Sequence, residues 1–122
     1  MADILLIDDD ELVCAMIKTI LGVSGHEVRV ANTGFDGLAE ARGRAPDLIL
    51  LDMGLPGRDG YAIAKDLRAM LANKTLPIIA VTAYDSASDY DAAYASGCSG
   101  FVAKPIDEDR LRSVVAEQLA KQ

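Results

Sequence analysis

The chain has 122 residues, of which 19 are acidic and 12 are basic, and its formal net charge is −7. This length suits a single compact domain, and a hydrophobic content of 51% excludes a disordered chain. The acidic balance argues against direct binding to nucleic-acid phosphates or to anionic membranes, because both attract clustered lysine and arginine.

We expect neither a membrane span nor a secretory signal. No apolar run approaches the roughly 20 residues that cross a bilayer, and Asp3 stands where a signal peptide needs a basic and then apolar start. Cys14 and Cys98 lack the spacing of a disulfide framework. We therefore expect both to be small packing residues in a protein of the reducing cytoplasm.

Strand-like and helix-like segments alternate along the chain, five of each. Residues 4–7, 48–51 and 78–81 are continuous apolar runs, which is typical of strands buried on both faces of a parallel sheet. Residues 27–31 alternate between polar and apolar, and residues 99–103 are only partly apolar. These two segments are predicted as the edge strands.

Helical periodicity fills the intervals between these strands. Apolar residues three and four apart predict three amphipathic helices. Their stripes consist of Val13, Met16, Ile17, Ile20 and Leu21; of Ile63, Leu67, Met70 and Leu71; and of Leu111, Val114, Val115 and Leu119. A weaker helix is predicted at about residues 34–42. The helix at about residues 87–96 contains no Leu, Ile, Val or Met, so we expect it to be the least firmly packed.

The alternation predicts one α/β domain over residues 1–122, a doubly wound (βα)5 fold with a parallel sheet. With the second and fifth strands at the edges and right-handed crossovers, the predicted strand order is 2-1-3-4-5. The switch point of this order lies between the first and third strands. Ligands of such sheets bind at the carboxyl ends of the strands near that point.

Chemically active side chains follow the predicted strands at these carboxyl ends. After the first strand come Asp8, Asp9, Asp10 and Glu11, and after the third strand comes Asp52. Thr82 ends the fourth strand and Lys104 follows the fifth. The topology therefore brings at least three carboxylates, one hydroxyl and one ammonium group to one rim.

Neighbouring carboxylates repel one another, and a hard divalent cation such as Mg²⁺ relieves the repulsion because it prefers oxygen ligands. Lys104 supplies a further positive charge, and Thr82 can donate a hydrogen bond to an oxyanion. A carboxylate nucleophile, Mg²⁺ and a lysine are suited to phosphoryl transfer, in which positioning and neutralisation of charge do most of the catalysis.

These residues, in this order, resemble the receiver domain of two-component response regulators. The resemblance rests on the acidic pair Asp8 and Asp9, on Asp52 in the segment LDMGLPG, on Thr82 in the segment VTA and on Lys104 before Pro105, and it covers essentially the whole chain. It implies a CheY-like, flavodoxin-like fold and a phosphorylation-dependent switch.

The resemblance implies that Asp52 accepts a phosphoryl group from a sensor histidine kinase or a histidine phosphotransfer protein. It implies that Asp9 binds Mg²⁺ directly, that Asp8 helps through a water molecule, and that Asp52 and the backbone carbonyl of Gly54 complete the protein ligands. Such a chain is not a classical enzyme, although it catalyses its own phosphoryl transfer and dephosphorylation.

Further roles follow from the same resemblance. Lys104 would contact the phosphoryl group, and its peptide bond to Pro105 would be cis. Thr82 would close onto the acyl phosphate, and Phe101 resembles the aromatic residue that moves with it. Gly54 and Tyr84 occupy the two positions that line the path of the hydrolytic water in the family. We expect Tyr84 to hinder this water and to lengthen the phosphorylated lifetime.

Simpler interpretations exist for several of these residues. Asp10 and Glu11 are expected to cap the first helix, since carboxylates stabilise a helix N-terminus. Asp52 taken alone could be a turn residue, because glycine and proline follow it at once. His26 has no second histidine or cysteine pair near it in the sequence, and we expect it to be a solvent-exposed turn residue.

Three other functions fit parts of this sequence less well than a receiver domain does. A haloacid-dehalogenase-type phosphatase would use Asp8 and Asp10, but Leu12 stands where its motif needs Thr or Val, and Asp52 would have no role. A flavodoxin-like electron carrier needs hydroxyls and amides at the flavin phosphate, where this chain has acids. A receiver-shaped scaffold that is never phosphorylated is disfavoured by the completeness of the site.

The output of the predicted switch is expected on the face built from the fourth helix, the fifth strand and the fifth helix, which carries Tyr90, Tyr94 and Phe101. The weakly anchored fourth helix suits an element with two arrangements. At this length we expect a stand-alone receiver, a monomer or weak dimer, that signals by contact with a downstream protein and does not bind nucleic acid or enter the membrane.

Overall fold

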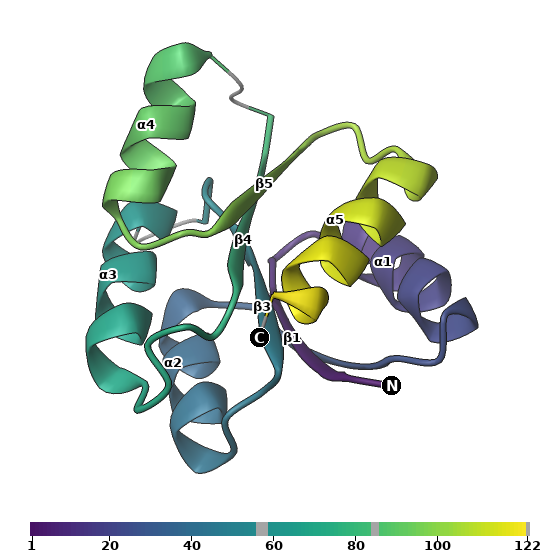
Figure 1. Cartoon of the computed structure of the whole chain (residues 1–122), viewed down its shortest axis with the longest axis horizontal. Coiled ribbons are helices and arrows are strands. Elements are labelled where there is room, and N and C mark those ends of the chain that lie inside the picture. Colours follow the sequence, from purple (N-terminus) through teal and green to yellow (C-terminus); the bar gives the residue numbers. More distant parts are fainter. Residues whose placement is uncertain (56–58, 84–85, 122) are drawn as a thin grey trace.

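The computed structural model describes residues 1–55, 59–83 and 86–121. Strands and helices alternate along these residues as the sequence predicts (Figure 1). The elements are β1 (Asp3–Ile7), α1 (Glu11–Val23), β2 (Glu27–Ala31), α2 (Gly34–Gly43), β3 (Leu48–Asp52), α3 (Gly60–Met70), β4 (Ile78–Thr82), α4 (Ala87–Ala95), β5 (Gly100–Ala103) and α5 (Glu108–Ala120).

The five strands form one parallel sheet in the order β2-β1-β3-β4-β5, which confirms the predicted topology. Helices cover both faces of the sheet, with α1 and α5 on one side and α2, α3 and α4 on the other (Figure 1). β1 and β3 are neighbours although α1, β2 and α2 separate them in the chain. Their adjacency creates the switch point at which the carboxyl ends converge.

The continuous apolar runs are buried on both faces, because alternate residues supply two separate cores. Leu5, Ile49 and Leu51 pack toward α2 and α3, whereas Leu6 and Leu50 pack toward α1 and α5. All five side chains are fully buried. The three central strands are thereby held in place from both sides, which fixes the positions of the residues that follow them.

Helix α1 has the predicted N-cap, but the face that it buries differs in part from the predicted apolar stripe. The Asp10 carboxylate accepts hydrogen bonds from the backbone amides of Leu12 and Val13, as expected of an N-cap. Met16, predicted on the buried stripe, is 40% exposed, and Cys14 is buried beside Ile17 instead. The sheet contacts a stripe centred on Ile17 and Leu21, which leaves Met16 at its margin.

Helix α4 is the least anchored helix, as predicted. Within Ala87–Ala95 only Ala93 is buried, and a capping box between Ser86 and Asp89 fixes the first turn. The ring of Tyr90 lies 4.0 Å from the ring of Phe101 on β5, centroid to centroid. Helix α4 thus rests on the sheet through one alanine and one aromatic contact rather than through aliphatic side chains.

The prediction of an exposed His26 was wrong. This residue is half-buried, and its Nδ1 accepts a hydrogen bond of 3.1 Å from the backbone amide of Ala2. Burial lowers the pKa of His26 below its ordinary value, and the positive charge of the nearby N-terminal ammonium group lowers this pKa further. The contact forms because the start of β1 lies beside the turn that precedes β2, a juxtaposition that only the sheet register creates.

No helix among the described residues is both long enough and apolar enough to span a bilayer.

Gly60 provides a test of how closely α3 approaches the end of β3. A Cβ atom at this position would lie 2.8 Å from the carbonyl oxygen of Asp52 and would also meet the Met53 backbone. We expect Gly60→Ala to lower the free energy of unfolding by about 2 kcal/mol in urea titrations, because overpacking against backbone cannot relax easily.

Gly22 is the matched control for this substitution. It lies in α1, and an added Cβ would meet nothing within 4 Å. Gly22→Ala should raise the free energy of unfolding by about 0.5–1 kcal/mol, because alanine loses less backbone entropy in a helix. Equal effects of the two substitutions would contradict the close approach.

Candidate functional site

The carboxyl ends of four strands bring the predicted site residues together. Asp8 follows β1, Asp52 ends β3, Thr82 ends β4, and Lys104 follows β5. The first three side chains are buried beneath the rim. The rim lies at the end of the sheet opposite the N-terminus (Figure 1).

Three carboxylates form an acidic cluster at this rim. Asp8, Asp9 and Asp52 each offer one carboxylate oxygen, and these oxygens all lie within 4.8 Å of one another. Asp8 is fully buried, whereas Asp9 is exposed. A set of closely spaced oxygen ligands without nitrogen or sulfur fits a hard cation such as Mg²⁺.

The Asp8 carboxylate is held by hydrogen bonds at both oxygens. Its Oδ1 accepts a bond of 2.9 Å from the Asp10 amide, and its Oδ2 accepts one of 3.2 Å from Nζ of Lys104. The pKa of Asp8 is nevertheless raised above its ordinary value of 3.8, chiefly by burial and also by the negative charge of Asp52. The Asp10 amide and Lys104 oppose this increase only in part.

Asp52 lies on the other side of the same ammonium group. Its Oδ1 is 3.6 Å from Nζ of Lys104 and accepts a hydrogen bond of 3.0 Å from the amide of Gly54. The Gly54 amide thus orients the Asp52 carboxylate, an interaction that sequence reasoning did not foresee. The expected metal contact of the Gly54 carbonyl stays a prediction.

Lys104 is the single described cation that contacts both buried carboxylates. Its backbone amide donates a hydrogen bond of 2.8 Å to the carbonyl oxygen of Thr82, so the ends of β4 and β5 are joined at the site. The peptide bond between Lys104 and Pro105 is cis, as the family resemblance implied.

Thr82, Phe101 and Tyr84 complete the set of predicted site residues. Thr82 is buried at the end of β4, and Phe101 is buried against the ring of Tyr90. Their movement on phosphorylation stays a prediction. Tyr84 lies outside the described residues, so its expected influence on hydrolysis is not tested by the structure.

Two site neighbours were missed from the sequence. The backbone carbonyl of Asp8 accepts hydrogen bonds from Nδ2 of Asn32 and from Sγ of Cys14. A signal for Asn32 was available, because it follows β2, and the predicted strand order already placed the end of β2 beside the end of β1. Cys14 was considered only as a packing residue.

Comparison with known proteins identifies the family. The response regulator receiver domain matches residues 4–116, and the chain belongs to this family. It is 32% identical to the protein PilH of Pseudomonas aeruginosa over 120 residues, which cover 98% of this chain and 99% of PilH. It is 35% identical to the transcriptional regulatory protein ZraR of Salmonella typhimurium over 118 residues, or 97% of this chain, but it spans only 26% of ZraR.

Solved structures agree with this assignment. A putative response regulator from Chloroflexus aurantiacus has a TM-score of 0.92 and 35% identity, with 98% of each chain covered. The receiver domain of the sensor histidine kinase PA1611 from Pseudomonas aeruginosa, which has a magnesium ion coordinated in its active site cleft, has a TM-score of 0.89 and 28% identity, again with 98% of each chain covered.

The chain is therefore a CheY-like receiver domain of two-component signalling, and the predicted fold and function are confirmed. Its family acts as a phosphorylation-dependent switch. The match gives no support to the phosphatase alternative that would use Asp8 and Asp10.

The electrostatics of the site predict that Asp52→Asn stabilises the cation-free protein. Because the pKa of Asp8 is raised on folding, the free energy of unfolding falls as the pH rises from 3.8 through the folded-state pKa. Removing the negative charge of Asp52 lowers the folded-state pKa of Asp8, and the free energy of unfolding then falls less as the pH rises. We expect the free energy of unfolding of Asp52→Asn to exceed that of wild type by on the order of 1 kcal/mol at pH 7.

Urea unfolding in the presence of EDTA measures this effect. The difference between the variant and the wild type should shrink as the pH falls through 3.8, because below that pH the Asp8 carboxyl is protonated in both the folded and the unfolded state. Asp91→Asn, at an exposed position of α4, is the control and should leave the stability unchanged. An Asp52→Asn protein that is no more stable than wild type at pH 7 would refute the repulsion.

Proposed function

We propose that Asp52 is the phosphoacceptor of this receiver domain and that Lys104 stabilises the transferred group. The observation that carries the proposal is the position of Nζ of Lys104, 3.2 Å from Asp8 and 3.6 Å from Asp52 within the acidic cluster. A phosphoryl group on Asp52 would add negative charge beside this ammonium group, which would then exchange a carboxylate partner for a phosphoryl oxygen.

We further propose that the acidic cluster holds Mg²⁺. Asp9 would bind the cation directly, Asp8 would bind through a water molecule, and Asp52 and the Gly54 carbonyl would complete the protein ligands. When bound, the cation would neutralise charge that develops on the phosphoryl oxygens. The oxygen-only donor set and the magnesium ion in the related PA1611 receiver domain support this assignment.

In the proposed reaction, a carboxylate oxygen of Asp52 attacks the phosphorus of a phosphohistidine. The P–N bond breaks, its electron pair stays on the histidine nitrogen, and an acyl phosphate forms on Asp52. The hydroxyl of Thr82 would donate a hydrogen bond to a phosphoryl oxygen. Later attack of water on phosphorus breaks the new P–O bond and restores the carboxylate, with release of inorganic phosphate.

The phosphoryl donor is a sensor histidine kinase or a histidine phosphotransfer protein, as membership of the family implies. We propose that it docks on two exposed residues of α1, named here the α1 apolar patch: Leu12, which is 83% exposed, and Met16. Both belong to the first two turns of the helix that begins directly after Asp9 and Asp10. A protein seated on the patch would bring its histidine close to Asp52.

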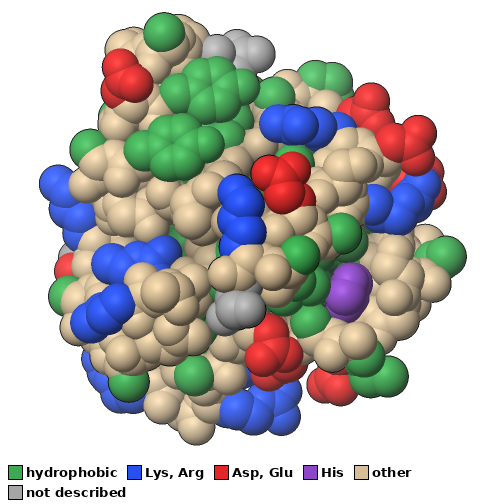
Figure 2. All heavy atoms as spheres, viewed as in Figure 1, with side chains coloured by type: hydrophobic (Ala, Val, Ile, Leu, Met, Phe, Trp, Pro, Cys, Tyr) green, Lys and Arg blue, Asp and Glu red, His purple; other side chains and the backbone are tan. Residues whose placement is uncertain are grey.

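The output is proposed to leave through the face of α4, β5 and α5. Hydrophobic side chains gather over α4 in Figure 2, and a hollow on this face is lined by residues that include Tyr90, Tyr94 and Phe101. Movement of Phe101 would disturb the Tyr90 ring above it and so alter α4. A downstream protein would recognise this change. We expect this contact to take place in the cytoplasm.

Phosphotransfer to Asp52 is tested with a phosphorylated histidine kinase and Mg²⁺. Wild type and Asp91→Asn should gain one phosphoryl group by intact mass, whereas Asp52→Asn should gain none because an amide cannot form the acyl phosphate. Lys104→Met should be slowed by at least about tenfold, since it loses the charge that stabilises the transition state. Labelling of Asp52→Asn as fast as wild type would overturn the site assignment.

The α1 apolar patch is tested by Leu12→Asp and Met16→Asp. Each should slow transfer from the kinase by about tenfold, because a buried interface residue contributes on the order of 1–2 kcal/mol to docking. Labelling by acetyl phosphate should remain at the wild-type rate. Val23→Asp is the control, since Val23 is 81% exposed at the opposite end of the same helix. Equal slowing by Val23→Asp would show that docking does not depend on the patch.

A further inference from the structure

Three hydrogen bonds hold the backbone of Asp8 in place. Its carbonyl oxygen accepts a hydrogen bond of 3.2 Å from Nδ2 of Asn32 and one of 3.4 Å from Sγ of Cys14. Its amide donates a bond of 3.0 Å to the carbonyl oxygen of Ala31. Consecutive residues at the end of β2 therefore bind both polar groups of the Asp8 backbone.

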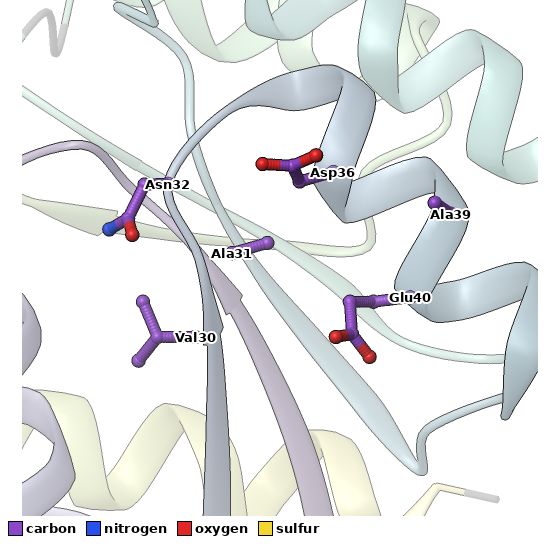
Figure 3. Close-up of a pocket in the computed structure, with 6 residues that line it drawn as sticks. All are labelled: Val30, Ala31, Asn32, Asp36, Ala39 and Glu40. Atoms are coloured by element: carbon purple, nitrogen blue, oxygen red, sulfur yellow. The ribbon is translucent and has the colours of Figure 1, made fainter.

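An asparagine just before a helix often acts as the N-cap, but here the next residue, Thr33, has that role. The N-cap of α2 is Thr33, whose Oγ1 accepts the amide of Asp36 at 3.0 Å. Figure 3 shows the Asn32 side chain on the other side of the chain from the α2 carboxylates of Asp36 and Glu40. The Asn32 amide thus serves neither as a helix cap nor as a partner of those acids, and its donor is directed to Asp8.

Cys14 supports the same carbonyl from the opposite element. Burial, together with the charges of Asp8 and Asp10, raises the pKa of the Cys14 thiol to about 11. The thiol therefore keeps its proton near neutral pH and acts as a donor, although a weak one. With Asn32 and Cys14 as donors, both lone pairs of the Asp8 carbonyl oxygen are engaged.

We propose that Asn32 is a positioning residue for the cation site, because it fixes the Asp8 backbone and so sets the direction of the Asp8 carboxylate, with Cys14 as the second donor. The proposal rests on the proposed function, since it needs Asp8 to face Mg²⁺. The Asp8 side chain is fully buried and has little room to turn, and both polar groups of its backbone are bonded to the end of β2, so the backbone position limits the directions that the carboxylate can take. Groups that orient metal-binding side chains commonly alter affinity when removed.

The test is a Mg²⁺ titration of the unphosphorylated full chain by calorimetry. Asn32→Ala and the similarly shaped Asn32→Leu should each weaken Mg²⁺ binding by about tenfold. Cys14→Ala should have a smaller effect, because a thiol is a weaker donor than an amide. The matched control is Asn73→Ala, which removes another hydrogen-bonded loop asparagine, in the connection between α3 and β4, and should leave binding unchanged.

A second readout separates positioning from a general loss of stability. With acetyl phosphate as donor, the Mg²⁺ concentration that gives half the maximal labelling rate should rise for Asn32→Ala, while the maximal rate approaches that of wild type. A merely structural role would lower the free energy of unfolding and leave both Mg²⁺ measurements unchanged.

The outcomes distinguish the inference from the function beneath it. If wild type binds Mg²⁺ and both Asn32 variants bind it equally well, the positioning role is refuted and the proposed function stands. If wild type itself fails to bind Mg²⁺, the proposed cation site is refuted and the positioning role with it. Weaker binding by both variants, with Asn73→Ala unchanged, supports the inference.

Discussion

The ammonium group of Lys104 between Asp8 and Asp52 is the interaction on which the site depends. Two carboxylates are buried at the switch point of the sheet, and the negative charge of Asp52 contributes to the raised pKa of Asp8. At separations near 4 Å, unit charges interact by about 4 kcal/mol at an effective dielectric constant of 20. Lys104 opposes this repulsion without eliminating it, so the site favours the arrival of further positive charge.

The rest of the fold holds this unfavourable group of charges together. β1, β3 and β4 are apolar on both faces, and the two cores they form with the helices fix the strand ends to which the acids belong. The hydrogen bond from the backbone amide of Lys104 to the carbonyl oxygen of Thr82 then joins the residue that carries the ammonium group to the residue that carries the hydroxyl, across the ends of β4 and β5. A displacement of Lys104 or Thr82 would consequently act on two strands at once.

The sequence was sufficient to predict the strands, their order and the main site residues, because continuous apolar runs identify central strands and the topology dictates where their carboxyl ends meet. It indicated that the end of β2 lies beside the end of β1, but not which side chain there bonds to backbone far away in the chain. The bond from Asn32 to Asp8 spans 24 residues and needs the parallel register of Ile7 with Ala31. Met16 was misplaced because helical periodicity gives a stripe but not the angle at which the sheet contacts it.

The close approach of Gly60 to the end of β3 has a mechanical consequence. On that side of Asp52, backbone meets backbone with no space for even a methyl group. On the side of β4, α4 is seated by one alanine and one aromatic pair. The packing around Asp52 is therefore tighter toward α3 than toward α4, and a displacement at the end of β3 meets less resistance from α4 than from α3.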